Sequence, residues 1–219
     1  MNDWKRKHLR LLISRLNKER KKQARQIDIL CNDFVAAQKE FIVSLKAISF
    51  TANFYESITG LTDLNELLVT AAKHIQNQIE GANVVFFLPK ENNFEMHIFD
   101  SVQSIDFLAQ GEIENNDRRI ENFFTAELVD NITASRRACS IDEMLAMGLQ
   151  CAPGCLDKLT AAAIPLSCDN GSVGFLLLYR NSQKLLVPDE ISCIGQITTG
   201  LARSIAACRN QVETSNLMD

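Results

Sequence analysis

The chain has 219 residues, of which 46% are hydrophobic and 23% are charged, and its formal net charge is -4. These values are ordinary for a folded protein and allow one sizeable domain with an appendage. The sequence has no signal peptide and no apolar run of eighteen or more residues, so we expect a cytoplasmic protein whose 7 cysteines are reduced thiols.

The charge is distributed unevenly along the chain. Residues 1–25 contain ten Lys or Arg against Asp3 and Glu19, which gives this segment a net charge near +8. Because the whole chain has a net charge of -4, residues 26–219 have a net charge of about -12. Such acidity argues against nucleic acid binding by residues 26–219.

The basic segment of residues 1–25 has three interpretations: a solvated helix end, a contact with an anionic membrane, or a contact with nucleic acid. The apolar face for a membrane would consist of Trp4, Leu9, Leu12 and Leu16.

Residues 2–50 contain no Gly or Pro and predict one long helix that continues to about Thr59, where Gly60 ends it. Its second half has a seven-residue repeat that is typical of a coiled coil or a helix bundle. The repeat consists of Ile27, Leu30, Phe34, Ala37, Phe41, Ser44 and Ile48. An isolated helix is marginal in water, so we expect this stripe to have a partner helix.

Asp63 and Glu66 have the spacing of a capping box and predict the start of a second helix. One apolar face of that helix comprises Leu64, Leu67, Leu68, Ala71, Ile75 and Ile79. After Gly81, residues 82–88 and 94–99 predict the first two strands of an antiparallel sheet. Between residues 100 and 153 we expect surface loops and two short amphipathic helices. The first would contain Ile120, Phe123, Phe124 and Leu128, and the second Ile141, Met144 and Leu145.

Residues 160–179 form two apolar runs around Asn170-Gly171, which is a hairpin signal. Because the runs hardly alternate with polar residues, we expect these strands at the centre of the sheet. Pro188 then begins a terminal helix that extends to about Val212. Its stripe predicts a second seam, formed by Ile191, Ile194, Thr198, Leu201, Ile205, Cys208 and Val212.

Several segments after residue 160 resemble the GAF domain family in their order and spacing. The matching segments are Ala163-Ile164-Pro165-Leu166, Asp169-Asn170-Gly171, Val173 to Leu178, and Leu186 with Asp189 before the last helix. Leu186 stands where the family usually has an aromatic residue. The resemblance covers about residues 50–210.

The resemblance implies an α+β fold with three layers: a central antiparallel sheet of five or six strands with helices on both faces, preceded here by the long helix. It also implies a sensory module with dimerising helices on one face of the sheet and a ligand pocket on the other. Asn181, Lys184, Leu185 and Asp189-Glu190 only partly match the family's cyclic nucleotide motif, and the chain has no Cys-His dipeptide for a bilin. We therefore predict no specific cofactor, only an unidentified small-molecule ligand.

Cys151 and Cys155 are separated by only three residues, and Cys139 precedes them, so these cysteines are the strongest local indication of chemistry in the sequence. One branch of the GAF family reduces free methionine sulfoxide with cysteines in this region, which makes these three thiols the candidates for redox chemistry. However, Leu156 stands where that branch has an acidic residue. The alternative, which we favour, is that most of the cysteines, including Cys31, Cys168, Cys193 and Cys208, are small core or seam residues.

The three histidines His8, His74 and His97 show no ligand-pair spacing, so we predict no metal site. The sequence also has no phosphate-binding glycine loop, nucleophile elbow or HExxH motif. We therefore expect no hydrolase or kinase activity.

These observations predict a long helix over residues 1–50, a GAF-like domain over 51–213 and a tail over 214–219. The function we expect is that of a non-catalytic regulatory module, a homodimer through its terminal helices that controls an unidentified partner protein. The dimer seam would consist of Ile27, Leu30, Phe34, Phe41, Ile48, Ile191, Ile194, Leu201 and Ile205. The ligand would contact Phe99, Phe124, Met144, Leu145, Cys151, Cys155 and Ala162.

Overall fold

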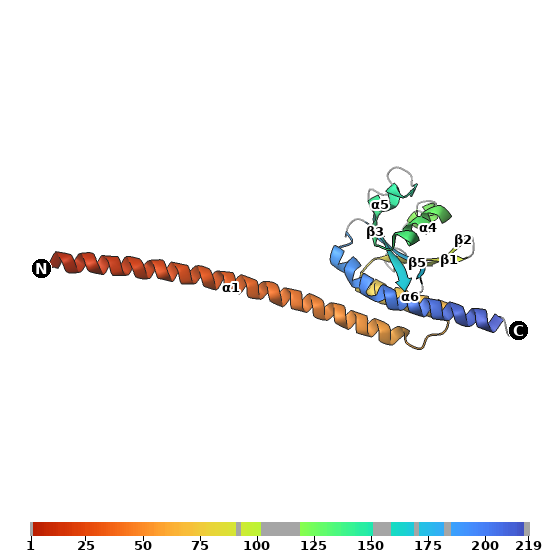
Figure 1. Cartoon of the computed structure of the whole chain (residues 1–219), viewed down its shortest axis with the longest axis horizontal. Coiled ribbons are helices and arrows are strands. Elements are labelled where there is room, and N and C mark those ends of the chain that lie inside the picture. Colours follow the sequence, from red (N-terminus) through yellow and green to blue (C-terminus); the bar gives the residue numbers. More distant parts are fainter. Residues whose placement is uncertain are drawn as a thin grey trace, which may run out of the picture. The chain divides into compact units, whose positions relative to one another are not determined.

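The computed structural model describes residues 2–90, 93–101, 119–150, 159–168, 171–181 and 185–216. The chain divides into two compact units, residues 1–49 and residues 50–219 (Figure 1). The first unit consists of one helix, and the second contains the sheet.

Helix α1 (Asn2–Ile58) confirms the predicted long helix. It has no glycine or proline to interrupt its backbone hydrogen bonds, and it is followed by Gly60, whose φ of +86° favours glycine. Its last turns belong to the second unit, where Phe50, Phe54 and Ile58 are buried.

Helix α2 (Leu64–Gln78) begins as the sequence predicts. A side-chain oxygen of Asp63 accepts a hydrogen bond of 2.8 Å from the backbone N–H of Glu66, which satisfies a donor at the helix start.

Strands β1 (Asn83–Lys90) and β2 (Asn93–Phe99) follow and pair antiparallel. Both predicted strands are therefore confirmed.

The predicted hairpin of residues 160–179 is also confirmed. Strands β4 (Leu159–Cys168) and β5 (Gly171–Asn181) pair along their length, and β5 pairs with β1. With the short β3 (Cys139–Ser140), the described residues form a five-stranded antiparallel sheet in the order β2-β1-β5-β4-β3. Gly174 of β5 has φ +133°, and a Cβ there would lie 2.0 Å from the carbonyl oxygen of Phe87. Only glycine therefore allows β1 and β5 to approach this closely.

Helices α2 and α6 (Pro188–Asn216) cover one face of the sheet, and the end of α1 packs against these two helices. The Phe54 ring meets the His74 ring edge to face at 6.1 Å. The residues of α6 that point to the sheet are buried, among them Ile194, Leu201 and Ile205, each 0% exposed. The predicted C-terminal dimer seam is thus corrected: these side chains lie in the core of their own chain, and Ile191 lies half-buried beside them.

The other face carries the 3₁₀ helix η2 (Ile120–Phe123), α4 (Ala126–Ser135) and α5 (Ile141–Ala146) (Figure 1). The predicted single helix from Ile120 to Leu128 is interrupted because Thr125 is extended and caps α4, accepting a hydrogen bond from the backbone N–H of Leu128. Helix α5 begins with a capping box between Ser140 and Glu143, and it confirms the second short helix.

The start of α6 is held by an ion pair. Arg180, which is 4% exposed, pairs with Glu190 at 2.8 Å, and Glu190 also accepts a hydrogen bond from the backbone N–H of Val187. Asp189-Glu190 partly matches a cyclic nucleotide motif, but Glu190 has a structural role here, because it holds the start of α6. The predicted three-layer α+β fold is confirmed as a whole.

Candidate functional site

The face of the sheet under α4 has an aromatic centre. The Phe87 ring stacks on the Phe175 ring at 4.7 Å with an interplanar angle of 12°, and Phe124 packs against both. This cluster also includes Met144, Leu128 and the other buried residues of α4 and α5. The side chains of these strands and helices bury the Phe87 and Phe175 rings completely and leave Phe124 only 7% exposed.

A polar cluster of four residues borders this apolar centre. The Tyr179 hydroxyl donates a hydrogen bond of 3.0 Å to Oε1 of Glu121, a carboxylate that is 1% exposed. Arg119 donates to both oxygens of Asp100, at 3.1 and 2.8 Å, and approaches Oε1 of Glu121 at 3.4 Å. The other Glu121 oxygen, Oε2, is buried and has no hydrogen-bond partner among the described residues. A buried, half-satisfied carboxylate is costly for stability, so it marks a candidate site of function.

The electrostatics of this cluster favour a charged Arg119 and a neutral Tyr179. The hydrogen bonds to Asp100 raise the pKa of Arg119 above its usual value. Burial, followed by the nearby Glu121 charge, raises the pKa of Tyr179. The tyrosine hydroxyl therefore remains a hydrogen-bond donor, and Glu121 Oε2 is left as an acceptor for a further donor.

Sequence reasoning did not identify this cluster. Glu121 lies within the apolar run from Ile120 to Phe124, and a charge inside such a run is the signal that could have pointed to it. Its partner Tyr179 is 58 residues away in the sequence and ends an apolar strand.

The predicted ligand-contacting residues do not form one group. Phe124 and Met144 lie together on the α4 face. Ala162 pairs with Leu178, and Phe99 with Val84, in the registers that point to the α2 and α6 face, where the Phe99 ring meets Phe86 at 5.9 Å. Leu145 is 39% exposed. Cys151 and Cys155 lie outside the described residues.

Cys139 occupies the short strand β3 and is 1% exposed. Its sulfur lies 3.3 Å from the Ser135 hydroxyl oxygen and 3.4 Å from the carbonyl oxygen of Arg137. Burial raises the pKa of Cys193 and of Cys208, so these thiols resist ionisation. Of the predicted redox thiols, the one that the structure describes is therefore enclosed in the core.

The histidines of the second unit lie on the α2 and α6 face. His74 packs against Phe54, and His97 lies on β2, where burial lowers its pKa. In the described part of the chain, no three His, Cys, Asp or Glu side chains lie close enough together to hold a metal ion.

The heptad stripe of α1 is exposed to solvent. Ile27, Leu30, Phe34, Phe41 and Ile48 are between 60% and 67% exposed. These five residues recur at steps of three, four and seven, which places them on one side of the helix.

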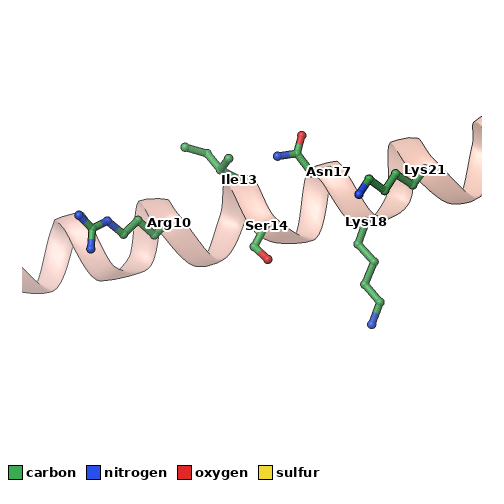
Figure 2. Close-up of a pocket in the computed structure, with 6 residues that line it drawn as sticks. All are labelled: Arg10, Ile13, Ser14, Asn17, Lys18 and Lys21. Atoms are coloured by element: carbon green, nitrogen blue, oxygen red, sulfur yellow. The ribbon is translucent and has the colours of Figure 1, made fainter.

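Figure 2 shows six residues of α1 between Arg10 and Lys21, of which Ile13 and Lys18 project to opposite sides of the helix. Arg10, Lys18 and Lys21 make this part of the helix surface basic. The described helices include none with the length and apolar character that crossing a membrane requires.

No family model matches the sequence, and no curated protein matches it. Solved structures do match. The GAF domain of a phosphoenolpyruvate-protein phosphotransferase from Coxiella burnetii superposes with a TM-score of 0.53 at 9% identity, over 77% of this chain and 98% of that one. The corresponding GAF domain from Acinetobacter gives 0.52 at 9% identity, with the same shares covered. At such identities the similarity establishes the fold, so the second unit has the fold of a GAF domain.

Proposed function

We propose that this chain is a non-catalytic regulatory module of the cytoplasm, in which a GAF-fold unit senses a small molecule and a pair of α1 helices joins two copies. The observation that carries the proposal is the exposed stripe of α1. Phe34 and Phe41 are 62% and 64% exposed, so no described part of the chain covers these two side chains. Burying one such side chain against a second helix is worth about 1.5–3 kcal/mol relative to leaving it in water.

The spacing of the stripe supports a second copy of this chain as the partner. Isoleucine or phenylalanine occupies each first heptad position from residue 27 to residue 48, and the fourth positions become small at Ala37 and Ser44. Large and small residues that alternate along one stripe can interlock with the same stripe of an identical helix. In our proposal the terminal helix α6 takes no part, because its apolar stripe is already buried.

The sensing role is supported by the fold and by the polar cluster. In GAF domains the face of the sheet opposite the dimerising helices holds the ligand, and in this chain that is the α4 face. Glu121 Oε2 offers a buried acceptor there, so we propose a ligand with an N–H or O–H donor, such as an amine or an amide. Ligand binding would then alter how the helices pack and so control a partner protein.

The thiols support a reducing compartment. The cysteines that the structure describes, Cys31, Cys139, Cys168, Cys193 and Cys208, are all free. Cys139, the one predicted redox thiol that the structure describes, is enclosed, which does not support redox catalysis at that residue.

Native mass spectrometry of the purified chain tests the proposal, because it reports subunit number and retained small molecules together. We expect a dimer for the natural chain and a monomer for Phe34→Ser/Phe41→Ser. A matched control, Asn32→Ser/Lys39→Ser, changes two positions outside the stripe and should remain dimeric. A natural chain that is monomeric at micromolar concentration would refute the dimer, and turnover of a substrate that is lost in Cys155→Ser would refute the non-catalytic role.

A further inference from the structure

The first 25 residues of α1 combine a basic face with an apolar face. Successive residues of a helix turn by about 100°, so Leu9, Leu12, Ile13 and Leu16 share one side. Each of these four side chains is between 45% and 62% exposed. Trp4, which the sequence pattern grouped with Leu9, Leu12 and Leu16, does not lie on that side. The opposite side carries cations, which include Lys7, Lys18, Lys22 and Arg25.

The two faces lie at the same level of the helix. In Figure 2, Ile13 projects away from Lys18, and Arg10 and Lys21 lie on the flank between the two faces. Most of the cations in residues 1–25 therefore lie outside the apolar strip, and two of them, Lys5 and Arg20, lie in line with it near its ends.

We infer that this segment docks on a lipid surface that carries anionic headgroups, with the strip of Leu9, Leu12, Ile13 and Leu16 at the level of the acyl chains. A helix of this kind lies in the interface plane, where its apolar face leaves water and its cations meet lipid phosphates and carboxylates. It does not cross the bilayer. This inference goes beyond the proposed function and does not depend on it.

The apolar strip decides between lipid and nucleic acid. A nucleic acid would neutralise the cations through its phosphates, but it would leave the four apolar side chains in water. A lipid interface accommodates both faces. A second copy of the chain is the other possible cover for the strip, because Ile13 lies two heptads before Ile27, and Leu9 and Leu16 lie three and two heptads before Leu30. A second copy would, however, leave the cations of the opposite side in water.

Sedimentation of the full chain with vesicles tests the inference. The probes are vesicles of phosphatidylcholine with phosphatidylserine, vesicles of phosphatidylcholine alone, and a short DNA duplex. We expect binding to the mixed vesicles that weakens with salt, and little binding to the neutral vesicles or to the duplex.

Two pairs of variants separate the contributions of charge and apolar surface. Lys18→Gln/Lys21→Gln should weaken binding to the mixed vesicles roughly thirtyfold, whereas Lys39→Gln/Lys46→Gln, with the same loss of charge outside the segment, should not. Leu16→Ser should weaken binding roughly tenfold, whereas Leu11→Ser, on the opposite side of the helix, should have a much smaller effect. Circular dichroism of each variant checks that α1 remains helical.

A fluorescent reporter locates the inserted face. Trp4 is the single tryptophan of the chain, so Trp4→Phe combined with Leu9→Trp or with Lys18→Trp gives one reporter on each face. We expect the emission of the Leu9→Trp protein, and not that of the Lys18→Trp protein, to move to shorter wavelength on the mixed vesicles. Three results would overturn the inference: no binding to the mixed vesicles, equal effects of Leu16→Ser and Leu11→Ser, or tighter binding to the duplex than to the vesicles. Loss of self-association in Leu16→Ser without vesicle binding would assign the strip to a second copy.

Discussion

Helices α1 and α6 carry apolar stripes with nearly the same period, yet the two stripes have different surroundings. Leu30 of α1 is 67% exposed, whereas Leu201 of α6 is 0% exposed. Helix α6 follows the β4–β5 hairpin and packs directly on those strands, which cover its stripe within the chain. The heptad portion of α1 forms a unit of its own that contains no sheet. A stripe with a helical period therefore indicates that one side of a helix needs cover, but it does not indicate which surface provides it.

The largest expected effect comes from shortening one leucine in each stripe. Leu201→Ala should lower the free energy of unfolding of the second unit by about 2–5 kcal/mol, because it removes buried methyl groups and leaves a cavity. Leu30→Ala should leave that free energy nearly unchanged and weaken self-association instead. Urea unfolding at two protein concentrations measures both effects. Equal losses of stability in the two variants would contradict the difference between the stripes.

The next effect concerns the sheet face that α6 does not cover. Tyr179→Phe should lower stability by about 1–3 kcal/mol, because it removes a hydrogen bond from the Glu121 carboxylate, whose other oxygen has no partner among the described residues. Glu121→Gln/Tyr179→Phe, which also removes the buried charge, should be less destabilised than the sum of its single changes. Chemical unfolding of the four proteins completes this cycle, and strict additivity would indicate that the two side chains do not interact.

Two glycines of α6 lie on different sides of the helix, Gly200 on the side packed against α1 and Gly195 on an open side. A Cβ at Gly200 would lie 2.2 Å from the Tyr55 ring of α1, whereas a Cβ at Gly195 would meet nothing within 4 Å. Gly195→Ala should raise stability by about 0.5–1 kcal/mol, since alanine favours a helix more than glycine does. Gly200→Ala should gain less or destabilise the protein, because the half-buried Tyr55 ring must move. Thermal unfolding of both variants, with Tyr55→Ala as a background that restores the gain at position 200, checks this expectation.

The smallest expected effect is a pH dependence of stability that comes from His97 of β2, which lies on the sheet face covered by α6. Burial, and to a smaller extent the charge of Arg209 on α6, lower the pKa of His97, while Glu95 opposes them. As the pH falls, His97 of the unfolded chain, with a pKa near 6.5, therefore takes up a proton at a higher pH than His97 of the folded chain does. The contribution of His97 to stability is therefore complete above pH 6.5 and is lost as the pH falls below that value. Melting temperatures at pH 7.5 and 5.5 should differ less in His97→Gln than in the natural chain, and an unchanged difference would exclude this histidine as the cause.

Local signals predicted much of the fold. The Asp63 cap, the strands of residues 82–99 and the hairpin at Gly171 each depend on neighbouring residues, so a short stretch of sequence contained the necessary information. The break at Thr125 was missed because Ile120 and Leu128 fit one helical face equally well with or without it.

The candidate site was less accessible to sequence reasoning, because it depends on distant pairs and on strand register. Phe99 and Ala162 were grouped with Phe124, but the register turns both of them to the other face of the sheet. Whether a strand residue faces α4 or α6 changes with each step of one residue, and only the pairing of the strands fixes this choice.

Gly174 restricts how this sequence can change over time. Any other residue there would place a carbon atom within 2.0 Å of a backbone oxygen of β1, which cannot rotate away as a side chain could. A replacement of Gly174 by any other residue should therefore disrupt the pairing of β1 with β5. We therefore expect a glycine at this position in any relative that keeps the same β1–β5 pairing, which a comparison of such sequences can check.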